Sequence, residues 1–89
     1  EQAIDENINA NPNKGYYLVV GSFENLENAT TYLENVRKEY ANSRIIRSGI
    51  HNNYIVYVNE VSNEERSIES LMNFRKNTRF KDAWYLKIE

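Results

Sequence analysis

Side chains able to do acid-base or metal chemistry are few in this sequence, which contains one histidine, His51, and no cysteine. A zinc site needs several such ligands, and general acid-base catalysis needs a side chain held against its substrate. His51 falls in a stretch of turn composition, and Glu64 and Glu65 belong to a run, Ser62-Asn63-Glu64-Glu65, that fits a helix capping box. We therefore predict no catalytic residue, no metal site and no cofactor, and expect a protein that is not an enzyme.

Binding chemistry is better represented, because seven of the 89 residues are tyrosine. A tyrosine offers a flat apolar ring and a hydroxyl at a small entropic cost, which suits it to ligand surfaces. Several tyrosines fall in runs of β-branched and aromatic residues that are typical of strands. These runs span residues 16–20, 54–58 and 83–88. The tyrosines are therefore expected to lie on a sheet.

The stretches between these strands predict two helices and one more strand. Apolar residues recur at steps of three and four after Asn25, a plausible N-cap, and they are Leu26, Ala29, Leu33, Val36 and Tyr40. A second helix is expected after Ser62, with Ile68, Leu71 and Phe74 on its apolar side. Arg44 to Arg47 reads as a short strand, joined to the strand at 54–58 by a turn. The predicted order is β-α-β-β-α-β.

An internal repeat supports this order. Moving Tyr16 to Arg47 along by 38 residues lays it on Tyr54 to Tyr85 without gaps, so that Val20 meets Val58. Each half is one strand-helix-strand unit. Two such units predict an α+β, ferredoxin-like split βαβ fold, with a four-stranded antiparallel sheet and both helices on one face.

The predicted domain spans residues 15–89. Residues 1–14 hold four asparagines, one proline and little apolar surface, so we expect a flexible linker or tether there. The sequence has no apolar run near 20 residues and no signal-peptide core, which predicts no membrane contact by this stretch. It begins at Glu1, and we expect a fragment or a processed product.

Alternation along each strand predicts which residues face the helices. The helix side should receive Leu18, Val20, Val56, Val58, Trp84, Leu86 and Ile88. The opposite face should receive Tyr17, Val19, Ile55, Tyr57, Tyr85 and Lys87, with Ile45 or Arg47. No helix is expected to cover that second face, and an open apolar and aromatic patch usually marks a binding surface. Cover by the N-terminal tail, by a loop or by a second copy in a dimer is the alternative, so the chain is expected to be a monomer or a weak dimer.

Three motifs resemble those of the SPOR (sporulation-related repeat) domain family. Tyr16-Tyr17-Leu18-Val19-Val20-Gly21-Ser22-Phe23, followed by Glu27-Asn28-Ala29, is similar to the family's aromatic-x-V-Q-V-G-S-F opening and its spaced alanine. Tyr54 to Val58 resembles the strand of the family's second half, and Asp82-Ala83-Trp84 resembles its D-A-W. The likeness covers Gly15 to about Ile88. It departs at Val19, where many members have Gln, at Ile55, where Arg is frequent, and at Asn59-Glu60-Val61, where a second G-x-F is usual.

The resemblance implies a bacterial cell-envelope module that lies in the periplasm and is part of a cell-division or cell-envelope protein. Such a module binds peptidoglycan glycan strands stripped of their stem peptides, and the ligand lies along the sheet. Aromatic rings would stack on sugar C–H surfaces, and polar groups would meet hydroxyl and N-acetyl groups. The predicted glycan-binding residues are Tyr17, Val19, Ser22, Arg47, Asn53, Ile55, Tyr57, Trp84 and Tyr85. Trp84 is the conflicting case, because the resemblance places it near the ligand while alternation with Leu86 turns it into the core.

Two other binding functions compete with this one. An RNA-recognition motif shares the topology, but its third-strand signature needs a basic start and glycines that Tyr54 to Val58 lacks. The net charge of −2, with both signs interspersed, offers no basic field for nucleic acid. An interaction domain that meets another cell-envelope protein through the same face is the stronger alternative.

Overall fold

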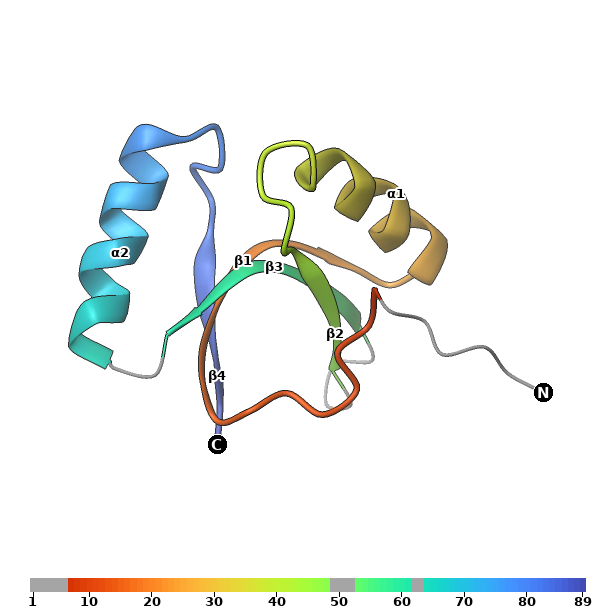
Figure 1. Ribbon diagram of the computed structural model, residues 1–89, viewed down its shortest axis with the longest axis horizontal. Helices are drawn as coiled ribbons and strands as arrows, with labels where there is room; N and C mark the ends of the chain where they lie inside the picture. The colour runs from red at the N-terminus through yellow and green to blue at the C-terminus, as the bar shows by residue number, and fades with distance from the viewer. Residues whose placement is uncertain (1–6, 49–52, 62–63) are drawn as a thin grey trace.

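The computed structural model describes residues 7–48, 53–61 and 64–89. The elements along the chain are β1 (Gly15–Phe23), α1 (Leu26–Val36), β2 (Arg44–Ser48), β3 (Asn53–Val61), α2 (Glu64–Asn77) and β4 (Trp84–Ile88). The strands form one antiparallel sheet in the order β2-β3-β1-β4, and both helices lie on one side of it (Figure 1). The predicted β-α-β-β-α-β fold is confirmed.

Helix α1 forms as its apolar spacing predicted. Asn25 is the N-cap, and its side-chain oxygen accepts hydrogen bonds from the backbone N–H groups of Glu27 at 2.7 Å and Asn28 at 3.2 Å. Ala29, Leu33 and Val36 are buried on the face toward the sheet. The stripe therefore anchors α1 over the centre of the domain.

Helix α2 corrects one prediction. Leu71 and Phe74 are partly buried against the core, as expected, but Ile68 is 59% exposed. Met72, one turn further along, is 66% exposed, so α2 presents two apolar side chains to solvent. The predicted cap residue Ser62 lies outside the described residues.

Two compensating irregularities bend the central strands. Leu18 pairs with Asn59 and Val19 with Tyr57, so Val58 is an extra residue on β3. Gly21 then pairs with Val56, so Val20 is an extra residue on β1. Bulges of this kind increase local bend and twist, and β1 and β3 arch across the molecule in Figure 1. The two extra residues, Val20 and Val58, are 38 residues apart and therefore occupy equivalent positions in the two halves of the sequence repeat.

Both faces of the sheet are apolar, and each carries its own cluster. The helix face holds Leu18, Ala29, Leu33, Val36, Ile45, Val56, Phe80 and Ala83. The opposite face, called the far face below, holds Tyr17, Val19, Ile46, Ile55 and Tyr57, with Leu86 and Ile88 packed against them. The alternation predicted for β1 and β3 is confirmed.

The faces predicted for β2 and β4 were wrong. Ile46, rather than Ile45 or Arg47, occupies the far face. On β4, Tyr85 packs on the helix face, whereas Leu86 and Ile88 belong to the far face. Both strands carry apolar residues at even and odd positions, so hydrophobicity alone does not select a side when both sides of the sheet are buried.

Gly21 is required by close packing rather than by its backbone angles, which differs from the usual reason for a glycine at a turn. A Cβ at this position would lie 2.8 Å from a ring carbon of Tyr32 and 2.9 Å from one of Phe23. These rings pack against each other with centroids 5.1 Å apart, and the Tyr32 hydroxyl donates to the Val20 carbonyl at 3.0 Å. The glycine of the G-S-F motif thus leaves room for an aromatic pair from α1 and β1.

We expect Gly21→Ala to lower the free energy of unfolding by about 1–3 kcal/mol, the usual cost of overpacking. The added methyl group forces Tyr32 to move and strains its hydrogen bond to Val20. Urea denaturation followed by circular dichroism measures the change. Combining Gly21→Ala with Tyr32→Ala should cost less than the sum of the two single changes, whereas strict additivity would contradict the proposed clash.

Candidate functional site

The far face is covered, which contradicts the prediction that it is open. Val19 is 0% exposed and Tyr57 is 6% exposed, and Tyr17 and Ile55 are also buried. Tyr17 and Tyr57 pack edge to face, with ring centroids 5.0 Å apart. The cover by the N-terminal tail that the sequence left as an alternative is the arrangement found.

The covering segment, called the strap below, comprises residues 7–14. It runs along the side of the sheet away from the helices, from the edge of β2 to the start of β1 (Figure 1). The Asn9 side chain donates to the Tyr57 hydroxyl at 3.1 Å, and the Tyr17 hydroxyl donates to the Asn13 carbonyl at 2.6 Å. The tether predicted for residues 1–14 stays a prediction, and residues 1–6 lie outside the described residues.

Trp84 lies on the far face and is 39% exposed. It is the cross-strand partner of Val19, and directly opposed residues in an antiparallel pair share a face. The interpretation of Trp84 as a core residue was therefore wrong. The first residue of β4 presents an indole ring to solvent beside the covered part of the far face.

Ser22 and Asn53 form a polar pair on the same face. Ser22 is the cross-strand partner of Ile55, which belongs to the far face, and the Asn53 amide donates to the Ser22 hydroxyl at 3.1 Å. Ser22 is exposed and Asn53 is partly so. Of the nine predicted binding residues, Ser22, Asn53 and Trp84 therefore combine the predicted face with access to solvent.

Arg47 and Tyr85 lie on the helix side of the sheet, away from the predicted site. Arg47 pairs with Tyr54, which packs against the helix-side core, and its guanidinium lies 5.9 Å from the centre of that ring. Tyr85 packs against the same core, and its hydroxyl is buried there. The structure does not bring these two residues together with the others.

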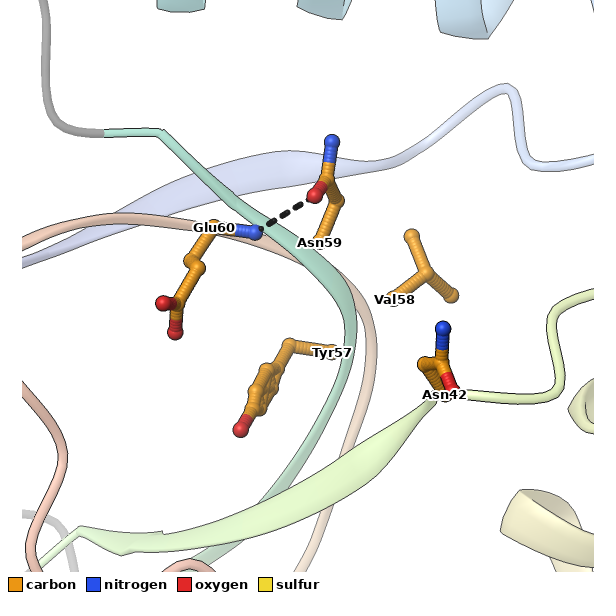
Figure 2. A pocket seen from close by; sticks show the side chains of 5 residues that line it. All are labelled: Asn42, Tyr57, Val58, Asn59 and Glu60. Carbon is orange, nitrogen blue, oxygen red and sulfur yellow. Dashed lines mark hydrogen bonds between the residues drawn. The ribbon is translucent and has the colours of Figure 1, made fainter.

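A hollow of about 170 Å³ lies where β3 runs past the beginning of β2, and Asn42, Tyr57, Val58, Asn59 and Glu60 line it (Figure 2). Figure 2 shows Tyr57 and Glu60 pointing to one side of β3 and Asn59 to the other. The Asn59 side-chain oxygen accepts from the Glu60 backbone N–H at 2.9 Å. Sequence reasoning missed Asn42, Asn59 and Glu60 as surface groups, because exposed polar residues at a strand end leave no periodic signal.

Burial raises the pKa of three tyrosines, Tyr17, Tyr32 and Tyr85, above the ordinary value of 10.0. At Tyr17 the carboxylate of Glu60 adds to the rise, because it opposes a second negative charge nearby. Glu60 is the cross-strand partner of Tyr17. The folded state therefore keeps these phenols neutral where the unfolded chain would ionise them.

Stability should consequently decrease in alkali. Below pH 10 both states keep the phenol protons, so the contribution is fully present. Above about pH 10 the unfolded chain releases protons that the folded state retains, so the free energy of unfolding falls until the pH has passed the raised pKa values. Urea denaturation at a series of pH values from 8 to about 11 measures the slope. Tyr17→Phe should make the slope shallower, and an unchanged slope would contradict the assignment to Tyr17.

Neither clustered metal ligands nor a membrane-spanning helix is found in the described part of the chain. Within residues 7–48, 53–61 and 64–89, no three potential metal ligands cluster together. None of the helices in those ranges is long and apolar enough to cross a membrane.

A family model described as the SPOR domain matches residues 12–87, which is nearly the whole chain. Neither the curated proteins nor the solved structures gave a match. The matched span begins within the strap and ends in β4.

Proposed function

Because the chain belongs to the SPOR domain family, a family of peptidoglycan-binding modules, we propose that it recognises glycan strands stripped of stem peptides through the far face of its sheet. SPOR domains are binding modules rather than catalysts, and they occur in bacterial cell-envelope proteins. We also propose that the module acts in the periplasm, at the division septum. The experiments below test which glycan it binds and which residues make the contact.

The observation that carries the proposal is the exposed ring of Trp84 beside Val19. Sugar rings present flat C–H faces, and an aromatic side chain accessible on one side offers the matching surface. Ser22 and Asn53 supply a hydroxyl and an amide on the same face for the polar groups of the sugar. These three residues make first contact in the proposed complex. Tyr17 and Tyr57 make contact where the strap no longer covers them.

Co-sedimentation with purified cell-wall sacculi tests this proposal. We expect the protein to sediment with sacculi, and more strongly after an amidase has removed the stem peptides. Trp84→Ala should reduce binding about two- to tenfold, because losing one stacked ring removes roughly 0.5–1.5 kcal/mol. The variant should also lose some stability, because more than half of the Trp84 side chain is buried, so its fold is checked by circular dichroism before binding is compared. Equal retention by treated and untreated sacculi would exclude recognition of stripped glycan.

The apolar pair on α2 favours a second candidate function. Ile68 and Met72 are one helical turn apart and exposed, so they could meet an envelope protein on a surface separate from the far face. The double variant Ile68→Ser and Met72→Ser should leave sedimentation with sacculi unchanged. Loss of sedimentation in this variant would place the peptidoglycan contact on α2 instead of the far face. It therefore also serves as the matched surface control for Trp84→Ala.

A further inference from the structure

We propose that the strap and the glycan strand are alternative occupants of the far face, so that full glycan contact requires the strap to leave. This inference rests on the function proposed above and adds a regulation of the same site. In the closed form residues 7–14 lie over the face, and in the open form the glycan takes their place.

The strap is attached to the sheet as a short extra edge. Ile8 forms a parallel bridge with Ile45, where the Asn9 N–H donates to the Ile45 carbonyl and the Ile45 N–H donates to the Asn7 carbonyl, each at 2.7 Å. Arg44 donates to the Ile8 carbonyl at 2.8 Å, and Arg37 donates to the Asn7 side-chain oxygen at 2.6 Å. Edge pairing of this kind is also how extended partners join a sheet.

The strap also takes up two hydroxyl groups of the far face. Asn9 donates to the Tyr57 hydroxyl, and the Tyr17 hydroxyl donates to the Asn13 carbonyl. A sugar hydroxyl or N-acetyl group would need the same donors and acceptors, because each phenol forms few hydrogen bonds. The strap and the ligand therefore compete for the same atoms as well as for the same surface.

The direct contacts that attach the strap to the sheet are mainly hydrogen bonds. Ile8 packs against the helix-side core, whereas Ala10, Asn11, Asn13 and Lys14 are exposed. Ordering eight residues opposes closure through lost backbone entropy, and these hydrogen bonds can be exchanged for bonds to water. Opening also withdraws Ile8 from the helix-side core and uncovers the buried far-face cluster, so the closed form is favoured until a glycan takes over that cover.

A glycine stands where the strap meets β1. Gly15 has φ 142°, a conformation that other residues rarely adopt. This position can act as a hinge about which the strap swings while β1 keeps its pairing with β3 and β4. The family match begins at residue 12, so the attachment through residues 7–9 precedes the matched span.

A disulfide that locks the strap provides the test, because the chain contains no other cysteine. Ile8→Cys with Ile45→Cys places two thiols on a parallel bridge, where neighbouring strands are about 4.8 Å apart, within the range of a disulfide. We compare the oxidised and reduced forms of this one variant for binding to amidase-treated sacculi. The oxidised form should bind at least about tenfold more weakly, because the open fraction sets the apparent affinity.

A matched control crosslinks the sheet without touching the strap. Tyr16→Cys with Lys87→Cys joins a directly opposed pair of β1 and β4 on the helix side, and its oxidation should not change binding. Asn9→Pro removes the N–H that donates to Ile45 and the amide that donates to Tyr57, so it should release the strap and strengthen binding.

The outcomes separate the two proposals. Equal binding by the oxidised and reduced forms of the strap variant, with binding by the wild type, overturns the competition while leaving the proposed function intact. Absence of binding by both the wild type and Asn9→Pro overturns the proposed function, and the competition falls with it. Binding by Asn9→Pro alone supports both.

Discussion

Tyr57→Ala is expected to lower the free energy of unfolding by about 3–5 kcal/mol, the range for removing a buried aromatic side chain. Tyr57 is buried on the far face, packs edge to face on Tyr17, and accepts a hydrogen bond from Asn9. The truncation opens a cavity between the sheet and the strap. A domain of this size has roughly 0.05–0.15 kcal/mol of stability per residue, so the loss is a large fraction of the total. Urea denaturation at neutral pH measures the loss.

Tyr57→Phe separates the ring from the hydroxyl. It keeps the packing on Tyr17 and removes only the bond to Asn9, so it should cost about 0.5–1.5 kcal/mol. A loss below about 1 kcal/mol for Tyr57→Ala would show that the ring is not buried in solution. The sequence alone had placed this tyrosine on an open surface, where its removal would weaken binding without unfolding. Trp84 is the better probe of glycan contact, because its side chain is far more exposed than that of Tyr57.

The elements themselves could be predicted because their signals are local. The stripe on α1 and its cap at Asn25 follow from residue types at helical spacing, and β1 alternates clearly between Leu18 and Val20 on one side and Tyr17 and Val19 on the other. One face of α1 and the two sides of β1 and β3 can be predicted from such patterns. These local signals are sufficient to specify the order of elements and the sheet.

The covered far face could not be predicted, because the strap is held largely by backbone groups and asparagine side chains. Hydrogen bonds such as that from the Asn9 N–H to the Ile45 carbonyl depend on chain path and leave no hydrophobic pattern. The prediction that Trp84 faces the helix-side core was wrong for a related reason. Trp84, Leu86 and Ile88 alternate regularly along β4, but alternation does not say which side they take when both faces of the sheet are buried. Only the register of β4 against β1 decides that Leu86 joins Tyr17 on the far face.

The family departures at Val19 and Ile55 gain a physical meaning from the strap. Many members are expected to have Gln and Arg at these positions, whereas this chain has apolar residues that are buried on the far face. An amide or a guanidinium would lose its hydration under the strap. The two substitutions therefore suit a sheet whose far face is closed in the absence of ligand.

Val19→Gln is accordingly expected to destabilise the closed domain by roughly 2–6 kcal/mol, of which overpacking contributes about 1–3 and an unpaired buried amide about 1–3. Val19 is fully buried between Tyr57 on β3 and Trp84 on β4. Val19→Met is the matched control, because it adds similar bulk without an amide and should show the packing cost alone. Urea denaturation of the pair isolates the polar contribution.

The same pair of variants should differ in binding. The Gln side chain regains hydration when the strap opens, so the variant shifts toward the open form and should bind amidase-treated sacculi more strongly than Val19→Met. Equal stability of the two variants would show that the amide reaches water while the strap is closed, which contradicts complete cover at Val19. A stability difference without a binding difference would show that opening at this position does not expose the glycan contact, and would place that contact at Trp84 and the Ser22–Asn53 pair alone.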